Sequence, residues 1–393
     1  NDDRPFLYDS VLAELNAHGF TVAAVFHPIF GVVRDSDGVR TRIANAGEGA
    51  PRESVIFAVI ARETSEQRLD TARNGVAKVL EDVMAATRDW RAMLERLEDA
   101  IGDLQHRPPP IAPAELDESI AFLRWLSENH FTFLGCRDYV FDAQGGRHTP
   151  VAESGLGLLA DPEARVVRRG TDRATLTDEV RGYLTEANPL IITKANVRST
   201  VHRRVHQDYI GIKRFDASGH LTGERRFVGL FTSAAYHRMP RDIPLLRRKT
   251  ARVIERAGFP HASHDGKALV NVLETFPRDE LFQISDDELF VTALGIMHLM
   301  ERPRTKTFLR FDRFDRFVSA LTFIPRERFS AHVAERIGEI LSQRFEGRVV
   351  IETPHFPDAP VARIHHIIRR NEGDRPVVDD AALQEEIGRA TRN

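Results

Sequence analysis

The stretch HRPPPIAPAE at residues 106–115 constrains the fold of this chain more than any other feature. Consecutive prolines lack the N–H groups that continue a helix, and they favour an extended spacer. A helical pattern precedes this stretch, and the amphipathic sequence ELDESIAFLRWLSENHF follows from residue 115. The chain has 393 residues, which is enough for two or three domains. The sequence therefore predicts separate domains on the two sides of a proline-rich linker.

The stretch DDRPFLYDSVLAELNAHGFTV at residues 2–22 predicts a tight turn, then a helix, then a strand. Val11, Leu12 and Leu15 share one face of this helix. We expect Asp9 or Ser10 to cap this helix, because their side-chain oxygens can accept backbone N–H bonds left open in the first turn. Gly19 is expected to end it, because glycine tolerates a positive φ.

The rest of this first segment predicts a small α+β sandwich. Apolar residues flank a DSDG turn at 35–38, which indicates a hairpin. The near-continuous apolar run ESVIFAVIA at 53–61 predicts one further strand. Residues 65–104 repeat apolar positions at steps of three and four, which is typical of one long helix or two.

Two further blocks follow the linker. Residues 132–232 hold several candidate strands, and helical patterns return over 240–300, which predicts an antiparallel sheet with helices gathered to one side. Residues 302–370 have the order strand, strand, helix, strand, strand. A helix with acidic first residues is expected at 379–390, as the entrance to another domain.

Composition excludes several classes of protein. The net charge of −3 gives no overall attraction to nucleic acid or to an anionic membrane. No run of about 18 uncharged apolar residues exists, and no signal-peptide pattern is present, so we expect an intracellular protein. The single cysteine, Cys136, excludes an internal disulfide and a thiolate-rich metal site. No serine elbow and no P-loop appear, and the residues alone predict no reaction centre.

Three local patterns are better explained by structure than by chemistry. GLGLLA at 155–160 has the glycines of a dinucleotide loop, but it lacks the flanking strand and helix, so we predict a turn. His202 and His206 lie four apart, and His261 and His264 lie three apart. A zinc site needs three or four ligands with carboxylate or thiolate support, so hydrogen-bonded or solvated roles are favoured for these histidines.

The most basic stretch is VRSTVHRRVHQDYIGIKRF at 197–215, which contains Arg198, Arg203 and Arg204 and is joined by Arg226. Basic residues beside Tyr and Phe could form a face for single-stranded nucleic acid. Acidic residues balance the chain overall, so an anion pocket or a subunit contact is favoured instead. We therefore predict no nucleic-acid partner and no membrane partner.

Several long strings carry a resemblance to a known family. DDRPFLYDSVLAEL, AFLRWLSENHFTFLGCRDY and ITKANVRSTVHRRVHQDYIGIKRFD are similar to the N-terminal half of the large NAD-specific glutamate dehydrogenases of bacteria, as are SHDGKALVNVLETFPRDELFQ and RFDRFVSALTFIPRERF. The similarity extends from residue 2 to about 370.

The resemblance implies that the parent is a very long, cytoplasmic, oligomeric polypeptide that oxidatively deaminates L-glutamate with NAD. Its catalytic domain lies downstream, so the resemblance places no catalytic, cofactor-binding or metal-binding residue on these positions. The implied partners are that downstream domain, further copies of the chain and an amino-acid effector. The absence of a starting Met and the ending RATRN also suggest a piece of something longer.

The resemblance also implies a multidomain α+β fold, in which two ACT-like, ferredoxin-like sandwiches flank a PAS-type antiparallel sheet domain with extra helices. The expected boundaries are 1–105 for the first ACT-like domain, 106–113 for the proline-rich linker, 114–302 for the PAS-type domain with appended helices, 303–372 for the second ACT-like domain, and 373–393 for the start of a following helical segment.

The opening turn is the candidate effector or interface site. DRPFL is similar to the ACT turn DRPGL, at which ACT domains bind amino acids, and a packing role is favoured for the phenylalanine that replaces the glycine. The turn residues are Asp3, Arg4, Pro5, Phe6 and Leu7. A regulatory and oligomer-forming portion of a dehydrogenase is the leading hypothesis. The alternatives are an amino-acid sensor with its ligand at an ACT interface, or a pure assembly scaffold.

Overall fold

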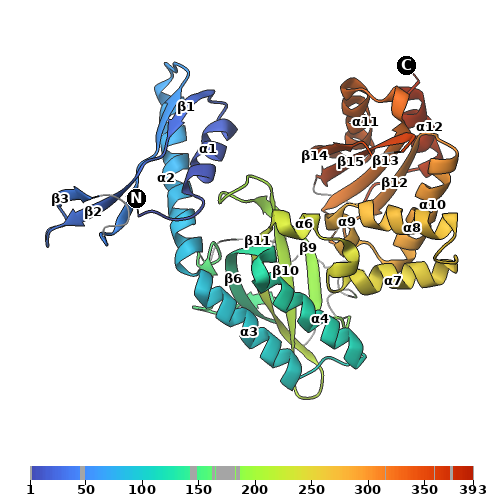
Figure 1. Cartoon of the computed structure of the whole chain (residues 1–393), viewed down its shortest axis with the longest axis horizontal. Helices are drawn as coiled ribbons and strands as arrows, with labels where there is room; N and C mark the ends of the chain where they lie inside the picture. Colours follow the sequence, from blue (N-terminus) through green and yellow to red (C-terminus); the bar gives the residue numbers. More distant parts are fainter. Residues whose placement is uncertain are drawn as a thin grey trace. The chain divides into compact units, whose positions relative to one another are not determined.

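A computed structural model describes residues 2–44, 49–141, 148–161, 164, 182, 186–314, 316–357, 359–371 and 375–392 (Figure 1). The chain divides into two compact units. The first comprises Asn1–Ala112, Leu126–Arg169 and Ala187–Thr232, and the second comprises Pro113–Trp125, Gly170–Glu186 and Ser233–Asn393. Every ladder between named strands in the described part is antiparallel, which confirms the expected α+β class with antiparallel sheets.

The first unit opens with two helices beside a short ribbon. α1 (Leu7–Ala17) packs against the longer α2 (Glu66–Arg88) (Figure 1). β1 (Val22–Phe26) pairs with β5 (Phe57–Ile60) in a two-stranded sheet. Gly19 ends the α1 segment as expected, since its φ is 76° and its N–H donates to Asn16 O at 2.9 Å.

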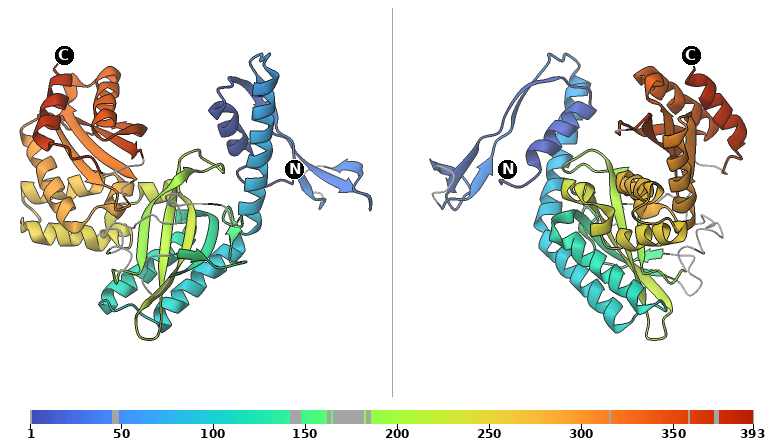
Figure 2. Two further views of the ribbon diagram at one scale, coloured as in Figure 1. Left: turned by 180° about the vertical axis from the view of Figure 1, so that it is seen from behind. Right: turned by 45° about the vertical axis from the view of Figure 1, so that its right-hand side comes forward.

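A second small sheet extends away from these helices (Figure 2). It consists of β2 (Ile29–Arg34), β3 (Arg40–Ala44) and β4 (Arg52–Ser54) in the order β3-β2-β4. The predicted hairpin is confirmed, because β2 and β3 pair across the DSDG turn. The single strand predicted for ESVIFAVIA is wrong, because β4 and β5 belong to different sheets.

The helical stretch that follows forms two helices. α3 (Trp90–His106) begins directly after Asp89 and packs across β6 and β10 of a larger sheet (Figure 1). This sheet has the order β7-β6-β11-β10-β9, and β8 pairs with β6. Its strands are β6 (Phe131–Phe141), β7 (His148–Pro150), β8 (Leu156–Gly157), β9 (Leu190–Arg198), β10 (His206–Phe215) and β11 (Leu221–Phe231).

One buried cluster joins the two parts of the first unit. Leu7 of α1 and Val79 and Val83 of α2 pack with Leu134 and Leu230 of the larger sheet. Burying an aliphatic side chain contributes about 1.5–3 kcal/mol each. The helices of the first ACT-like segment and the larger sheet therefore share a core.

The second unit begins with helices. α4 (Pro113–Trp125) follows the proline-rich linker, and its Glu118 accepts two bonds from Arg247, at 2.7 and 2.9 Å. The other helical elements are α6 (Ser233–His237), η2 (Pro240–Asp242), α7 (Leu246–Ala257), α8 (His264–Thr275), α9 (Arg278–Gln283) and α10 (Asp286–Glu301). The stretch 114–302, predicted as one PAS-type domain with appended helices, is thus divided. Its sheet lies in the first unit, which also holds η1 (Leu126–His130), and its helices lie in the second.

The second unit ends in a four-stranded sheet of order β12-β13-β15-β14. It is built from β12 (Lys306–Phe311), β13 (Phe317–Pro325), η3 (Arg326–Arg328), α11 (Ala331–Arg344), β14 (Gly347–His355), β15 (Val361–Arg370) and α12 (Asp380–Ala390). The order ββαββα is a cyclic permutation of the ferredoxin-like order βαββαβ. The predicted strands and helix of this block are confirmed.

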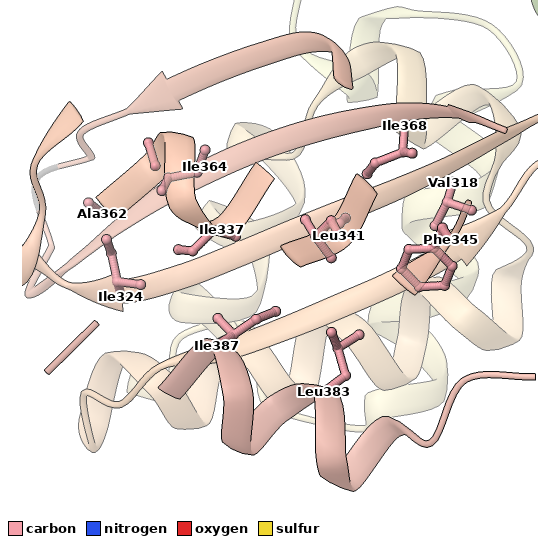
Figure 3. Packing of buried hydrophobic residues seen from close by; sticks show 12 residues of the cluster. Val318, Ile324, Ile337, Leu341, Phe345, Ala362, Ile364, Ile368, Leu383 and Ile387 are labelled. Atoms are coloured by element: carbon pink, nitrogen blue, oxygen red, sulfur yellow. The ribbon is translucent and has the colours of Figure 1, made fainter. Parts of the chain in front are cut away.

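α12 packs on this sheet. Its Leu383 and Ile387 are fully buried with Ile337 and Leu341 of α11 and with side chains of β13 and β15 (Figure 3). The segment 373–393, expected to start a following domain, therefore contributes its helix to the core of this one. A permuted ββαββα sandwich needs that second helix to cover its sheet.

Candidate regulatory site at the first helix

The opening turn places Phe6 in a strained backbone conformation. Phe6 precedes α1 with φ 72° and ψ −5°, the left-handed region that costs an L residue roughly 1–2 kcal/mol. The prediction that Asp9 or Ser10 caps α1 is wrong, because the helix already begins at Leu7. Ser10 Oγ instead donates to Phe6 O at 2.6 Å, which ties the turn to the first turn of the helix.

The other turn residues are anchored on neighbouring elements. Asp3 accepts from Arg52 of β4 at 2.8 Å through its side chain, and its N–H donates to Arg52 O at 2.9 Å. Arg4 Nη1 lies 3.5 Å from Thr87 Oγ1 of α2. Pro5 is exposed and Leu7 is buried in the shared cluster. The turn is therefore held between α2 and β4.

A loop from the larger sheet covers this turn. Residues 199–205 connect β9 to β10, and we call them the 199–205 loop. His202 N–H donates to Ser10 Oγ at 2.8 Å, and His202 Nδ1 lies 3.2 Å from Asp9 Oδ2. The imidazole ring packs on the Phe6 ring with centroids 5.0 Å apart. Residues 192 positions apart in sequence thus meet at one site.

An ion pair between buried Glu14 and half-exposed Arg204 reinforces the contact one turn further along α1. Glu14 is 6% exposed, accepts from Arg204 and lies 2.9 Å from His18 Nε2. A Cβ at Gly75 of α2 would lie 2.4 Å from Glu14 Oε1, so any side chain there would displace the Glu14 carboxylate. Thr200 adds a bond to Asp82 of α2 at 2.7 Å. The loop therefore docks on α1 and α2 together.

The predicted basic residues divide between two places. Arg203 and Arg204 lie in the 199–205 loop, where Arg203 Nη2 donates to Phe231 O at 2.7 Å. Arg198 is exposed at the end of β9, opposite His206. Arg226 lies in the middle of β11, away from the loop in the ladder. The structure thus brings Arg204 to Glu14 of α1, holds Arg203 against the end of β11 and leaves Arg226 in a separate cluster.

Arg226 belongs to a buried polar group on the larger sheet. Its Nε donates to Glu224 at 3.0 Å, its Nη2 lies 2.6 Å from His148 Nδ1, and its guanidinium lies 3.6 Å from the Tyr139 ring centroid. Tyr209 also donates to Glu224, and burial raises the pKa of Tyr209 well above its ordinary value. Burial alone would lower the pKa of Arg226, but Tyr209 and Glu224 raise it by a larger amount. The pKa of Arg226 therefore lies above its ordinary value. The guanidinium already faces a carboxylate, so it is not an open anion site.

A buried charge cluster in the second unit was not predicted from the sequence. Glu280 of α9 accepts two bonds from Arg310 of β12, at 2.7 and 2.9 Å, and both side chains are at most 10% exposed. His365 of β15 lies 2.9 Å from Ser319 Oγ and 3.7 Å from Glu280 Oε1. Both contacts use the same ring nitrogen, Nε2. A serine–histidine–acid triad requires opposite nitrogens, so this group is structural.

The remaining candidate motifs have structural explanations. Gly157 has φ 58° and its carbonyl oxygen accepts from Ala160 N–H at 3.0 Å, which confirms the predicted turn at GLGLLA. His206 is buried and bonds to Ala195 O at 3.1 Å. Burial raises the pKa of Cys136 to about 12, so its thiol stays protonated. Among the described residues, no group of three or more metal-binding side chains gathers, and no helix is long and apolar enough to cross a bilayer.

Comparisons with known proteins agree with this architecture. Residues 1–76 match the glutamate dehydrogenase ACT1 domain, residues 243–302 its helical motif 1 and residues 306–393 its ACT2 domain. These matches define an α+β chain with two ACT domains, and α12 falls within the second. Together they cover more than half of the chain.

Three curated relatives are each named NAD-specific glutamate dehydrogenase. The one from Halomonas elongata is 37% identical over 400 residues, and the one from Pseudomonas aeruginosa is 34% identical over 398; both alignments cover the whole chain. The one from Mycobacterium tuberculosis is 28% identical over 373 residues, or 93% of the chain. The chain spans 25%, 24% and 22% of these relatives. The chain belongs to this family and corresponds to its N-terminal region.

Proposed function

We propose that this chain is the non-catalytic regulatory and oligomerisation portion of an NAD-dependent glutamate dehydrogenase in the cytoplasm. The parent would convert L-glutamate, NAD and water to 2-oxoglutarate, ammonia and NADH on a catalytic domain further along the same polypeptide. The supporting observation is the set of three domain matches on a chain that spans only about a quarter of its relatives. The larger sheet, with α3 across it, is proposed as the PAS-type domain.

An exposed apolar face supports the assembly role. Phe26 and Phe57 are paired opposite each other on the β1–β5 ribbon, with ring centroids 6.2 Å apart. They are 60% and 59% exposed, and Val55 and Val59 nearby are also exposed. Clustered exposed apolar side chains mark interaction surfaces, whereas single ones need no explanation. We propose that this ribbon contributes to contacts between copies of the chain.

Light scattering of the purified chain tests the assembly role. We expect an oligomer that dissociates toward the monomer in the double variant Phe26→Ser, Phe57→Ser, because the substitutions make the apolar face polar. Val291→Ser is the matched control, since Val291 is a 65% exposed apolar residue on α10. A monomer at all concentrations would remove the assembly role. Turnover of glutamate and NAD by the chain alone would overturn the non-catalytic role.

Amino-acid sensing is the second candidate function. It is favoured by the ACT1 match, which includes the opening turn, and by the backbone N–H groups that begin α1 there. An effector would act by binding one conformation of the chain better than another. Calorimetry with a panel of amino acids tests this candidate, and the absence of heat at millimolar concentrations would count against it.

A further inference from the structure

Two strained residues face each other at the opening turn. Phe6 has φ 72° and His202 has φ 66°, and both are non-glycine residues in the left-handed region. Their rings are in contact, with centroids 5.0 Å apart. Such conformations persist only where the surroundings over-determine them, and they gather at clamps and switches. The contact between the two residues is therefore a specific, built interaction.

The α1–α2 side of this contact is acidic and the loop side is basic. Asp9, Glu14 and Asp82 supply carboxylates, which meet His202, Arg204 and the hydroxyl of Thr200. Arg204 reaches the most buried of these carboxylates, Glu14. Charge complementarity of this kind selects a partner and fixes its register.

Val201 anchors the loop. It is fully buried in the cluster that contains Leu7, Val79 and Val83. An apolar side chain in the core, flanked by polar contacts, is the arrangement by which a protein binds a peptide segment. The turn and the first two turns of α1 are thus covered by Val201, His202 and Arg204 of the same chain.

We propose that the opening turn of the ACT1 domain is a guanidinium-binding peptide site whose ligand is the chain's own 199–205 loop. This inference rests on the proposed regulatory function and deepens it, and it opposes the second candidate function, in which a free amino acid binds at the same turn. An external ligand of the turn has to displace the loop. Because Asp9 and Glu14 line the uncovered site, its ligands are cationic, guanidinium-bearing groups rather than the carboxylate of a free amino acid.

A peptide-rescue experiment tests the proposal in the full 393-residue chain. Residues 200–204 are replaced by Gly-Ser-Gly-Ser-Gly, and amide exchange of α1 is followed by mass spectrometry. We expect exchange in α1 to become about tenfold faster or more. A synthetic peptide of residues 197–207 should bind the variant and restore protection, whereas a scrambled peptide should not. A replacement variant that remains folded and does not bind the peptide would overturn the proposal.

Point variants keep the test decisive if the replacement impairs folding. Arg204→Gln should accelerate exchange in α1, and L-arginine amide should then protect α1 where L-glutamate does not. Arg241→Gln, which removes a solvent-exposed pair with Glu274, is the control and should leave α1 unchanged. Equal exchange in α1 for the two variants, or protection by L-glutamate alone, would refute the guanidinium site. The Phe26 and Phe57 face is untouched in all of them, so light scattering tests the proposed assembly role separately.

Discussion

Replacing Glu280 by Gln tests whether the buried charges of Glu280 and Arg310 in the second unit compensate each other. The substitution keeps the size of the side chain and removes the charge that faces Arg310. Glu280 is 2% exposed and meets Arg310 through two bonds, at 2.7 and 2.9 Å. Burial alone would raise the pKa of Glu280, but the Arg310 charge outweighs it and holds this pKa below its ordinary value. The carboxylate therefore stays ionised in the folded chain.

Glu280→Gln is expected to lower the free energy of unfolding, because it leaves the buried Arg310 cation without a compensating charge. Removing one partner of a buried pair costs about 3–5 kcal/mol, because the other charge stays buried without compensation. An exposed pair contributes only about 0–1 kcal/mol. Arg344 and Glu386 form such an exposed pair, with side chains 49% and 30% exposed, so Glu386→Gln is the matched control.

Tryptophan fluorescence during urea unfolding measures the change in the free energy of unfolding of the second unit. The chain has two tryptophans: Trp125 is buried on α4 of the second unit, and Trp90 begins α3 of the first. In a Trp90→Phe background the signal reports the second unit, which avoids treating a two-unit chain as one transition. A free-energy change for Glu280→Gln within about 1 kcal/mol of the control would refute the reasoning. The double variant with Arg310→Met should recover part of the loss.

Three further predictions follow from named residues. Burial lowers the pKa of His365 from 6.5 to about 4, so the unfolded chain binds the extra proton, and acidification from pH 7 to pH 5 should cost about 2 kcal/mol of stability, measured as the shift of the urea midpoint between these two pH values; His365→Asn should flatten that slope. Phe6→Gly should be about 1 kcal/mol more stable than Phe6→Ala in thermal melts, because both lose the ring and only glycine accepts φ 72° freely; equal melting would show that the turn relaxes. Leu383→Ala should destabilise the second unit by about 2–5 kcal/mol if α12 is part of its core, and an unchanged urea midpoint would contradict that packing.

Local sequence signals predicted the helices and strands well where side-chain periodicity agrees with the positions of prolines and turn residues. The proline-rich linker separates α3, which ends at His106, from α4, which begins at Pro113. The DSDG hairpin and the ββαββ order of the last block also follow from patterns within a few residues. ESVIFAVIA failed as one strand, because an apolar run does not show which sheet each half will join.

The candidate site was only partly predictable. The unusual Phe6 in the opening turn and the basic character of residues 197–215 were visible as separate features. Nothing in either segment indicated that His202 would contact Phe6, or that Glu14 would receive Arg204. The domain division was equally hidden, because the sheet and the helices of 114–302 pack in different units.

The sequence by itself determined the type and order of most helices and strands, because turn residues and side-chain periodicity act over a few neighbouring residues. Only the tertiary structure decided which elements share a core, which loop covers the first helix and which charges are buried together. Those outcomes depend on packing and desolvation between residues far apart in the chain, such as Glu14 with Arg204 and Glu280 with Arg310.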